Sequence, residues 1–300
     1  MKENKNEHIC FIINPVSGGK KKEHLRKWII EAFENEDKNV QIYFTGYPGH
    51  ASELANKLLQ EEVDIIVAVG GDGTINEIAR VLIEQDVKLA IIPYGSGNGF
   101  ARHFGFPLDP DASLQILKEG ITRKIDVGMA NDQPFFCTSG LGFDAETGYH
   151  FSHFGKRGFL SYAFSFLRVF KSYKALKYLI KINDISIERD AFFINVANIS
   201  QFGYNFKIAP DASTEDGFLD LVIVNKFPKW KGPWMAIQSL TGNIHKNPYV
   251  EYHKAIEIQI DIKSNYNHIH IDGEPGTGSG KMKYTINPSC LEVILPVAKS

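Results

Sequence analysis

Short apolar runs and amphipathic segments alternate along the first 125 residues of the chain. Four apolar runs have the length and composition of buried strands: residues 8–13, 40–44, 63–69 and 88–92. The segments with helical spacing or helix-starting patterns are residues 21–33, 50–60, 75–83 and 113–118. Strands that alternate with helices predict crossover connections, and therefore an α/β domain with a mostly parallel sheet.

The pattern changes near Thr122. Short β-rich runs follow, most of them separated by turn residues: 123–127, 133–140, 178–182, 185–188, 191–198, 218–224, 256–262, 267–271 and 291–295. One helical insert, residues 160–179, interrupts them. Regularly spaced short strands predict a second domain like a β-sandwich. We expect domains at residues 1–125 and 126–300, with the last segment free to pack back on the first domain.

A glycine loop, Gly70–Thr74, comes directly after the apolar run 63–69 and opens a helix. Glycines let the backbone approach a phosphate closely, and a helix N-terminus presents unpaired N–H groups. Two further loops, residues 14–20 and 93–102, also follow strands. Ligands of parallel sheets bind at the carboxyl ends of strands, where all three loops fall. The loops predict a polyphosphate site, although an ordinary turn explains the loop of residues 14–20 equally well.

Side chains within these loops suggest separate roles. Thr74 and Glu77 have the spacing of a capping box, which predicts that they satisfy the end of their helix. A carboxylate such as Asp72 repels phosphate unless a cation intervenes, which suggests Mg²⁺. The Ser96 hydroxyl can donate to a phosphate, and Asn98 either holds the loop shape or helps to bind the nucleotide.

Composition excludes some classes of protein. The chain has 33 basic and 35 acidic residues, so a broad positive surface for nucleic acid is not expected. Its three cysteines lie far apart without metal-ligand spacing, which predicts buried thiols in a reducing compartment. The polar N-terminus and the lack of an apolar run of about 20 residues predict a cytoplasmic protein.

Two histidine pairs, His150/His153 and His268/His270, could share a metal by spacing alone. Neither pair adjoins a cluster of cysteines or carboxylates, apart from Asp272 beside the second pair. We therefore expect these histidines to pack or to form hydrogen bonds.

The order of the motifs Asn-Pro-x-Ser-Gly, Gly-Gly-Asp-Gly-Thr and Gly-Ser-Gly-Asn resembles the diacylglycerol kinase catalytic domain. Residues 45–51 resemble the adenine-side segment of that family, and residues 137–145 resemble its crossover into the second domain. Residues 210–220 and 271–274 are similar to its two C-terminal signatures. The last, Asp-Gly-Glu, distinguishes the chain from NAD kinases and phosphofructokinases, whose α/β fold the first domain is expected to share.

This resemblance to soluble bacterial lipid kinases implies roles for individual residues. The residues implied to contact ATP are Asn14, Pro15, Val16, Ser17, Gly18, Thr45, Gly70, Gly71, Asp72, Gly73, Thr74, Ile75, Asn76 and Ser96. Asp272 and Glu274 are implied to be catalytic, one of them as the base for the lipid hydroxyl. Alternation places both on one side if the strand continues, whereas an Asp-Gly turn separates them, so the choice stays open. Asp216 is implied to hold a structural Mg²⁺ with the backbone carbonyls of Ser213 and Phe218.

The resemblance implies an ATP- and Mg²⁺-dependent kinase that phosphorylates the hydroxyl of a lipid such as diacylglycerol. The bacterial family often has Thr in place of Ser96 and Asp in place of Gly99, and the Gly-Ser-Gly-Asn form is similar to that of sphingosine and ceramide kinases. A sphingoid base, ceramide or phosphatidylglycerol therefore stays open as acceptor. A protein that binds ATP without turnover is the alternative of another class. Aromatic and basic residues in segments 159–179 and 227–234 suggest peripheral contact with the inner membrane face, or packing in the core. A homodimer stays open.

Overall fold

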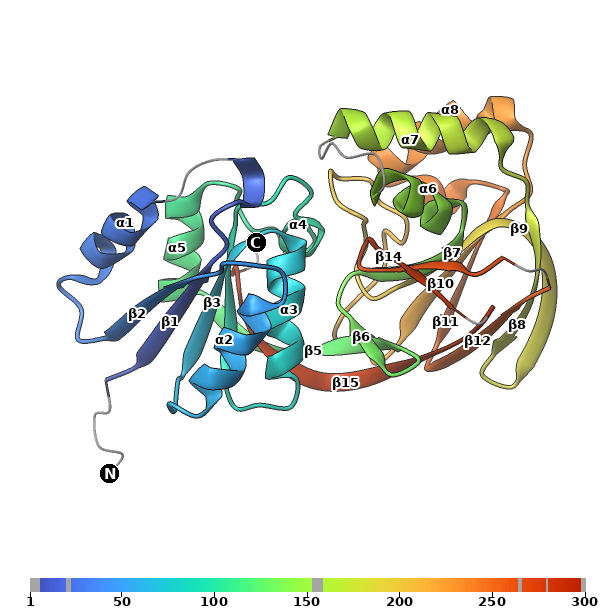
Figure 1. Cartoon of the computed structure of the whole chain (residues 1–300). Coiled ribbons are helices and arrows are strands. Elements are labelled where there is room, and N and C mark those ends of the chain that lie inside the picture. The colour runs from blue at the N-terminus through green and yellow to red at the C-terminus, as the bar shows by residue number, and fades with distance from the viewer. Residues whose placement is uncertain (1–5, 20–22, 153–158, 264–265, 279, 298–300) are drawn as a thin grey trace. The chain divides into compact units, whose positions relative to one another are not determined.

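The computed structural model describes residues 6–19, 23–152, 159–263, 266–278 and 280–297 (Figure 1). The chain divides into two compact units. Unit 1 comprises Met1–Ile125 and Ser289–Ser300, and unit 2 comprises Asp126–Pro288. The last strand, β15 (Lys281–Leu295), therefore begins in unit 2 and ends in unit 1.

Unit 1 is a parallel sheet flanked by helices. Its strands are β1 (His8–Ile13), β2 (Asn39–Phe44), β3 (Ile65–Gly70) and β4 (Lys88–Pro93), in the order β2-β1-β3-β4 with the end of β15 beside β4. Its helices are α1 (Glu23–Phe33), α2 (His50–Leu59), α3 (Asp72–Leu82), α4 (Gly99–His103) and α5 (Pro110–Glu119), together with a short 3₁₀ turn, Ser17–Gly19. Every element predicted in this part of the chain is present, although residues 21 and 22 of the first predicted helix lie outside the described residues.

The two central strands of unit 1 show why its sheet is parallel. All six residues of β1 and all six of β3 are buried, a pattern typical of strands covered by helices on both faces. One core cluster joins Phe11 and Val67 of the sheet to Ile29 of α1 and Leu117 of α5. Helices α2 and α3 contact the sheet and each other. The helices thus cover the faces of the sheet, and the glycine loops lie at the carboxyl ends of its strands.

Unit 2 is built from antiparallel strands. They are the second half of β5 (Ile121–Ala130), β6 (Gln133–Phe135), β7 (Thr138–Gly142), β8 (Leu176–Ile182), β9 (Ile185–Ala197), β10 (Leu219–Asn225), β11 (Val250–Ala255), β12 (Glu257–Ile262), β13 (His268–Ile271), β14 (Glu274–Thr277) and the first half of β15. The strand order is β14-β13-β7-β9-β8-β12-β15, and β10 pairs with both β9 and β11. The helical pieces are α6 (Phe143–Ser152), α7 (Phe159–Ser172), α8 (Gly232–Leu240) and the 3₁₀ turns η2 (Lys229–Lys231) and η3 (Ile244–Lys246).

The parallel sheet and the β-rich unit confirm the predicted fold class, but several elements of unit 2 differ from the prediction. The runs 185–188 and 191–198 form one strand, because the polar residues between them continue the strand and Arg189 pairs with Glu251 at 3.0 Å. The predicted helix 160–179 ends at Ser172, and its last residues belong to β8. Elements α6, α8, β11 and β14 were not predicted, since they are short or lack a clear apolar period.

Burial of the thiols was predicted correctly. All three cysteines are buried and unpaired with one another. Burial, followed by the nearby Glu61 carboxylate, raises the pKa of Cys10 to about 12. In the part of the chain that the structure describes, no helix is both long and apolar enough to cross a bilayer.

Candidate active site

The loops after β3 and β4 meet through bare backbone. A Cβ atom added to Gly71 would lie 3.0 Å from the Cα of Gly95, and one added to Gly95 would lie 2.5 Å from the Cα of Gly71. Tyr94 N also donates to Gly70 O at 2.7 Å. No other residue type fits at Gly95 without moving the neighbouring loop. Glycine here permits the close approach of two loops that both follow parallel strands.

The loop after β1, which we call the first loop, contacts the loops after β3 and β4 (the second and third loops) through Asn14 and Gly18. Asn14 Nδ2 donates to Thr74 Oγ1 at 3.1 Å, and Asn14 Oδ1 accepts from Val16 N at 3.1 Å. Gly18 has a left-handed backbone (φ +66°), and a Cβ there would lie 2.3 Å from Tyr94 O. The three loops therefore form one contiguous backbone surface at the carboxyl edge of the sheet.

Asn98 holds the third loop in shape. Its side chain accepts from Gly95 N and donates to Gly95 O, both at 2.9 Å, and only 3% of the residue is exposed. Asn98 also adopts a left-handed backbone with φ +49°. Of the two roles considered for Asn98, the structure shows the structural one. Ser96 stays exposed at the tip of the loop.

Asp72 links the second loop to the start of α4. Its Oδ1 accepts a hydrogen bond from Phe100 N at 3.1 Å, and the residue is half-buried. Burial raises the pKa of Asp72, and the backbone N–H groups of residues 98–100 oppose that rise. The sequence did not indicate this contact, because Asp72 and Phe100 belong to different loops.

The predicted capping box between Thr74 and Glu77 is wrong. Helix α3 begins after Gly71 without a side-chain cap, and Thr74 Oγ1 instead accepts from Asn14. The carboxylate of Glu77 accepts from Gly49 N at 3.0 Å and from Ala51 N at 3.1 Å. It therefore caps the neighbouring helix α2, where a negative charge is favourable.

All residues that the resemblance assigned to ATP lie at this edge of unit 1. Thr45 directly follows β2, and its N–H donates to Ile13 O at 2.9 Å. The remaining residues lie on the first loop (Asn14, Pro15, Val16, Ser17, Gly18), on the second loop and the first turns of α3 (Gly70, Gly71, Asp72, Gly73, Thr74, Ile75, Asn76) and on the third loop (Ser96). Residues from four segments of the sequence are thus brought together.

In unit 2, Asp272 and Gly273 form a two-residue turn between β13 and β14. Both have positive φ angles, +50° and +81°, which is typical of a type I′ hairpin turn. Of the two arrangements left open for Asp272 and Glu274, the structure shows the turn and not the continuous strand. Glu274 begins β14 and is exposed.

The carboxylate of Asp272 binds the backbone that leads into β7. Its Oδ2 accepts from Phe136 N at 2.9 Å, and its Oδ1 accepts from Cys137 N at 2.7 Å and from Thr138 N at 3.1 Å. The carboxylate thus joins the hairpin to the segment before β7. Because both oxygens already accept hydrogen bonds, Asp272 is less available than Glu274 to take a proton from a substrate.

Helix α6 contacts both strands of this hairpin and supplies partners for two histidines. His270 Nε2 lies 3.0 Å from Asp144 Oδ2, and both side chains are buried. His268 Nδ1 lies 2.7 Å from Glu146 Oε2. The expectation of hydrogen bonding is confirmed for these two histidines, whereas His153 lies outside the described residues. Asp144 and Glu146 were missed, although their spacing of two residues matches that of the histidines.

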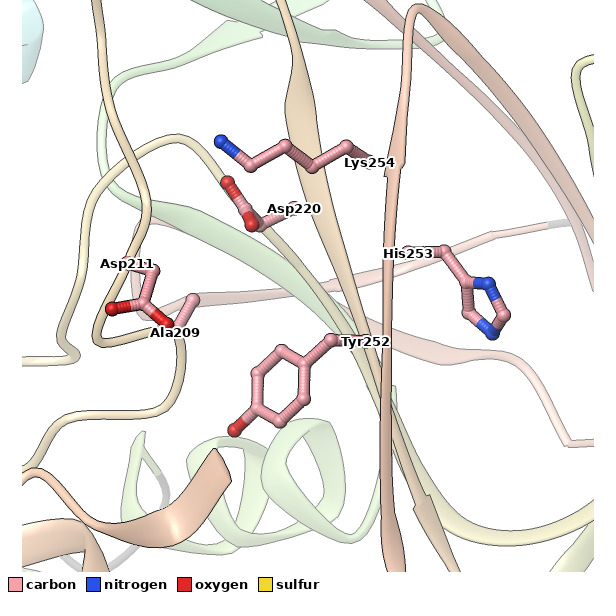
Figure 2. A pocket seen from close by; sticks show the side chains of 6 residues that line it. All are labelled: Ala209, Asp211, Asp220, Tyr252, His253 and Lys254. Atoms are coloured by element: carbon pink, nitrogen blue, oxygen red, sulfur yellow. The ribbon is translucent and has the colours of Figure 1, made fainter. Parts of the chain in front are cut away.

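A cavity of about 170 Å³ is lined by Ala209, Asp211, Asp220, Tyr252, His253 and Lys254 (Figure 2). Asp220 is 94% buried, and its Oδ2 has no hydrogen-bond partner among the described residues. Burial raises the pKa of Asp220 to about 6, although the ammonium of Lys254 opposes the rise. Asp220 lies in β10, and none of the residues that line the cavity belongs to the Asp272 hairpin.

The Asp216 carboxylate, which the resemblance implied to hold a structural metal, accepts hydrogen bonds from the protein in this arrangement. Asp216 Oδ1 accepts from Phe218 N at 3.1 Å, and Asp216 Oδ2 accepts from the ammonium of Lys254. The hydroxyl of Ser213 accepts from Glu215 N at 3.3 Å. Among the described residues, no group of three or more His, Cys, Asp and Glu side chains has the arrangement of a metal site. We therefore derive no step from a metal at Asp216.

Comparisons with known proteins match both units of the chain. Residues 8–130 match the model of the diacylglycerol kinase catalytic domain, and residues 138–295 match that of the YegS C-terminal NAD kinase beta sandwich-like domain. A diacylglycerol kinase of Bacillus subtilis (strain 168) is 30% identical over 89% of this chain and 89% of its own. One of Staphylococcus aureus (strain bovine RF122) is 30% identical over 89% of this chain and 85% of its own.

The fold is also found among solved structures. The crystal structure of a diacylglycerol kinase from Bacillus anthracis (strain Sterne) superposes with a TM-score of 0.73, covers 98% of both chains and is 22% identical in sequence. At this identity the likeness establishes the fold alone. Together, the two matched domains and the identity over most of the chain show that this protein belongs to the diacylglycerol kinase family.

Proposed function

We propose that the protein is an ATP-dependent lipid kinase that transfers the γ-phosphate to the hydroxyl of a lipid, with diacylglycerol as the first candidate acceptor. The observation that carries this proposal is the backbone contact between Gly71 and Gly95, in a chain of a lipid-kinase family. Phosphoryl transfer requires positioning and charge stabilisation more than covalent chemistry by the protein. A rigid backbone surface is suited to positioning.

In this proposal the three glycine loops hold the triphosphate of ATP by their backbone N–H groups. Helix α3 starts in the second loop, and its N-terminus favours negative charge. Asp72 supplies the carboxylate of the three glycine loops. Mg²⁺ prefers oxygen ligands, and one carboxylate together with phosphate oxygens is a typical set. When bound, Mg²⁺ would neutralise phosphate charge. The hydrogen bond from Phe100 N to Asp72 holds that carboxylate in place.

The acceptor hydroxyl needs a group that takes its proton as the new bond forms. We assign that role to Glu274, which is exposed, and a positioning role to Asp272, which holds the hairpin that carries Glu274. A carboxylate of ordinary basicity can act here, because the hydroxyl loses its proton late in a loose phosphoryl transfer.

Radiolabelled ATP with a panel of acceptors tests the function. The panel contains diacylglycerol, phosphatidylglycerol, sphingosine and ceramide, with NAD as a control. We expect labelled phosphatidic acid from diacylglycerol. Label only in sphingosine, ceramide or phosphatidylglycerol would change the acceptor, and label in NAD would overturn the lipid assignment. ATP binding by calorimetry without any labelled product would favour the non-catalytic alternative.

A glycine pair tests the proposed ATP surface. Gly95→Ala places a Cβ against the backbone of Gly71 and should weaken ATP binding by at least tenfold. Gly148→Ala, on α6, meets no atom closer than 4.0 Å and should bind ATP as the wild type does. Equal ATP affinity of the two variants would contradict the proposed phosphate site.

A further inference from the structure

A buried carboxylate–histidine pair joins helix α6 to strand β13. His270 Nε2 lies 3.0 Å from Asp144 Oδ2, and the two side chains are 5% and 10% exposed. A carboxylate accepts hydrogen bonds, so His270 carries a proton on Nε2 and donates it to Asp144. Because both groups are almost closed to solvent, the pair acts on the protein around it and not by contact with a substrate.

Three neighbouring strands make room for this pair. His270 of β13, Gly140 of β7 and Asn195 of β9 lie opposite one another in the sheet. A Cβ added to Gly140 would lie 2.3 Å from Asp144 Oδ2 and 2.7 Å from His270 Nε2, so the carboxylate occupies the space that a side chain would fill. Asn195 Nδ2 donates to the same oxygen of Asp144 at 3.4 Å. Four elements of unit 2 thus meet at one carboxylate.

This polar row costs free energy. His270 Nδ1 and Asn195 Oδ1 are buried, and neither has a hydrogen-bond partner among the described residues. Buried polar groups without partners destabilise a fold, and well-packed apolar side chains of similar size are often no less stable than a buried ion pair. A buried polar pair can instead fix one arrangement of the elements that it joins. The arrangement, more than stability, therefore explains the pair.

The elements that the pair joins carry the Asp-Gly-Glu hairpin. Helix α6 contacts both β13 and β14. Glu146 Oε2 lies 2.7 Å from His268 Nδ1, so α6 holds β13 at a second point. Further along α6, a Cβ added to Gly148 would lie 4.0 Å from Gly273 O, which places this part of the helix beside the turn of the hairpin. The helix is thus a support for the whole hairpin.

Glu274 lies directly beside the supported row. Across the hairpin, His270 is opposite Pro275, and Ile271 is opposite Glu274. We propose that Asp144 and His270 are positioning residues, which hold the hairpin on α6 so that Glu274 keeps the orientation in which it takes the proton of the acceptor hydroxyl. This inference rests on the proposed function, because it assigns a role within the same kinase reaction.

Steady-state kinetics with ATP and diacylglycerol test the role. His270→Leu should lower kcat about tenfold or more, while KM for each substrate stays within about twofold, because the pair touches neither substrate. His270→Gln keeps an N–H donor close to the position of Nε2 and should restore most of the lost kcat. Gly140→Ala keeps both members of the pair but places a methyl group between them, so it should lower kcat as His270→Leu does.

Tyr252→Phe is the matched control for a loss that is merely structural. It removes the hydrogen bond from Tyr252 Oη to Ile208 O, 2.8 Å long, elsewhere in unit 2. Its kcat should stay within about twofold of that of the wild type, even though the protein loses a hydrogen bond. An unchanged kcat in His270→Leu and Gly140→Ala, or an equal loss of kcat in Tyr252→Phe, would overturn the positioning role.

Amide hydrogen exchange of residues 268–277 measures the support without any kinase activity. Exchange in this segment should be about tenfold faster in His270→Leu and Gly140→Ala than in the wild type, and unchanged in Tyr252→Phe. An unchanged rate in the first two variants would overturn the inference. A wild type that phosphorylates no lipid but shows these exchange rates would instead overturn the proposed function and leave the support of the hairpin by α6 in place. If His270→Leu does not fold, His270→Gln and Gly140→Ala provide the same comparison.

Discussion

Asp272 Oδ1 lies 2.7 Å from the backbone nitrogen of Cys137, which is 135 residues earlier in the chain. With Phe136 N and Thr138 N, this contact makes a turn carboxylate into the acceptor for three successive N–H groups. Such an anchor ties the Asp-Gly-Glu hairpin to the segment that leads into β7. The two carboxylates of the signature therefore have different environments, since Asp272 accepts backbone hydrogen bonds and Glu274 is exposed.

Substitution of these carboxylates should separate their roles. Asp272→Ala leaves buried N–H groups without an acceptor, so we expect a loss of about 2 kcal/mol or more in the free energy of unfolding together with a loss of activity. Glu274→Gln should remove at least 99% of the activity while the free energy of unfolding stays within about 0.5 kcal/mol of that of the wild type. Kinetics and urea unfolding on the same samples measure both effects. An inactive Asp272→Ala protein of unchanged stability would return the base role to Asp272.

Glu77 should affect nucleotide binding through helix α2. Glu77→Ala removes the acceptor for Gly49 N and Ala51 N, which should lower stability by about 1 kcal/mol and weaken ATP binding several-fold. Glu77→Gln keeps one acceptor oxygen, so its stability and its affinity for ATP should lie between those of Glu77→Ala and the wild type. Calorimetric titration with ATP and thermal unfolding measure the two effects. A normal affinity for ATP in Glu77→Ala would show that residues 45–51 do not depend on this cap.

Lys254 should make the loop around Asp216 independent of metal. We expect chelation with EDTA to leave the melting temperature of the wild type unchanged. Lys254→Met removes the cation beside Asp216, Asp220 and Asp211 and should lower stability by about 1 kcal/mol, whereas Lys254→Arg keeps the charge and most of the stability. Addition of Mg²⁺ should then raise the melting temperature of Lys254→Met more than that of the wild type. A wild type that EDTA destabilises would restore the metal expected at Asp216.

Asp220 should make stability depend on pH. Its pKa in the folded protein is about 6, above the value near 4 of an unfolded aspartate, so the folded state holds the proton between these values. The stabilisation from this group is complete below about pH 4 and is lost as the pH rises through 6, by at most about 3 kcal/mol. Asp220→Asn removes this dependence.

Urea unfolding of Asp220→Asn and the wild type, at every half pH unit from 4 to 8, measures this pH dependence of stability. The quantity to compare is the difference between the two urea midpoints at each pH. The variant should gain stability relative to the wild type as the pH rises through 6. A constant difference across this range would show that Asp220 titrates normally.

Much of unit 1 could be predicted from sequence, because its strands are buried on both faces and its helices are amphipathic. Strand β1 has the predicted bounds, and α3 begins only a few residues before the predicted helix. In unit 2, alternation identified most strands, but β14 and α6 were missed, since a four-residue strand and a helix without a clear apolar stripe give little periodic signal.

Residue type and order alone determined that three glycine loops end parallel strands and that the family motifs are present, because local backbone freedom and periodicity are properties of neighbouring residues. Only the tertiary structure decided which groups each polar side chain meets. Glu77 caps a different helix, Asp216 binds Lys254, and Asp272 binds a distant backbone. Hydrogen bonds and ion pairs form between atoms that folding brings together, and their partners lie 26 to 136 residues apart in the sequence.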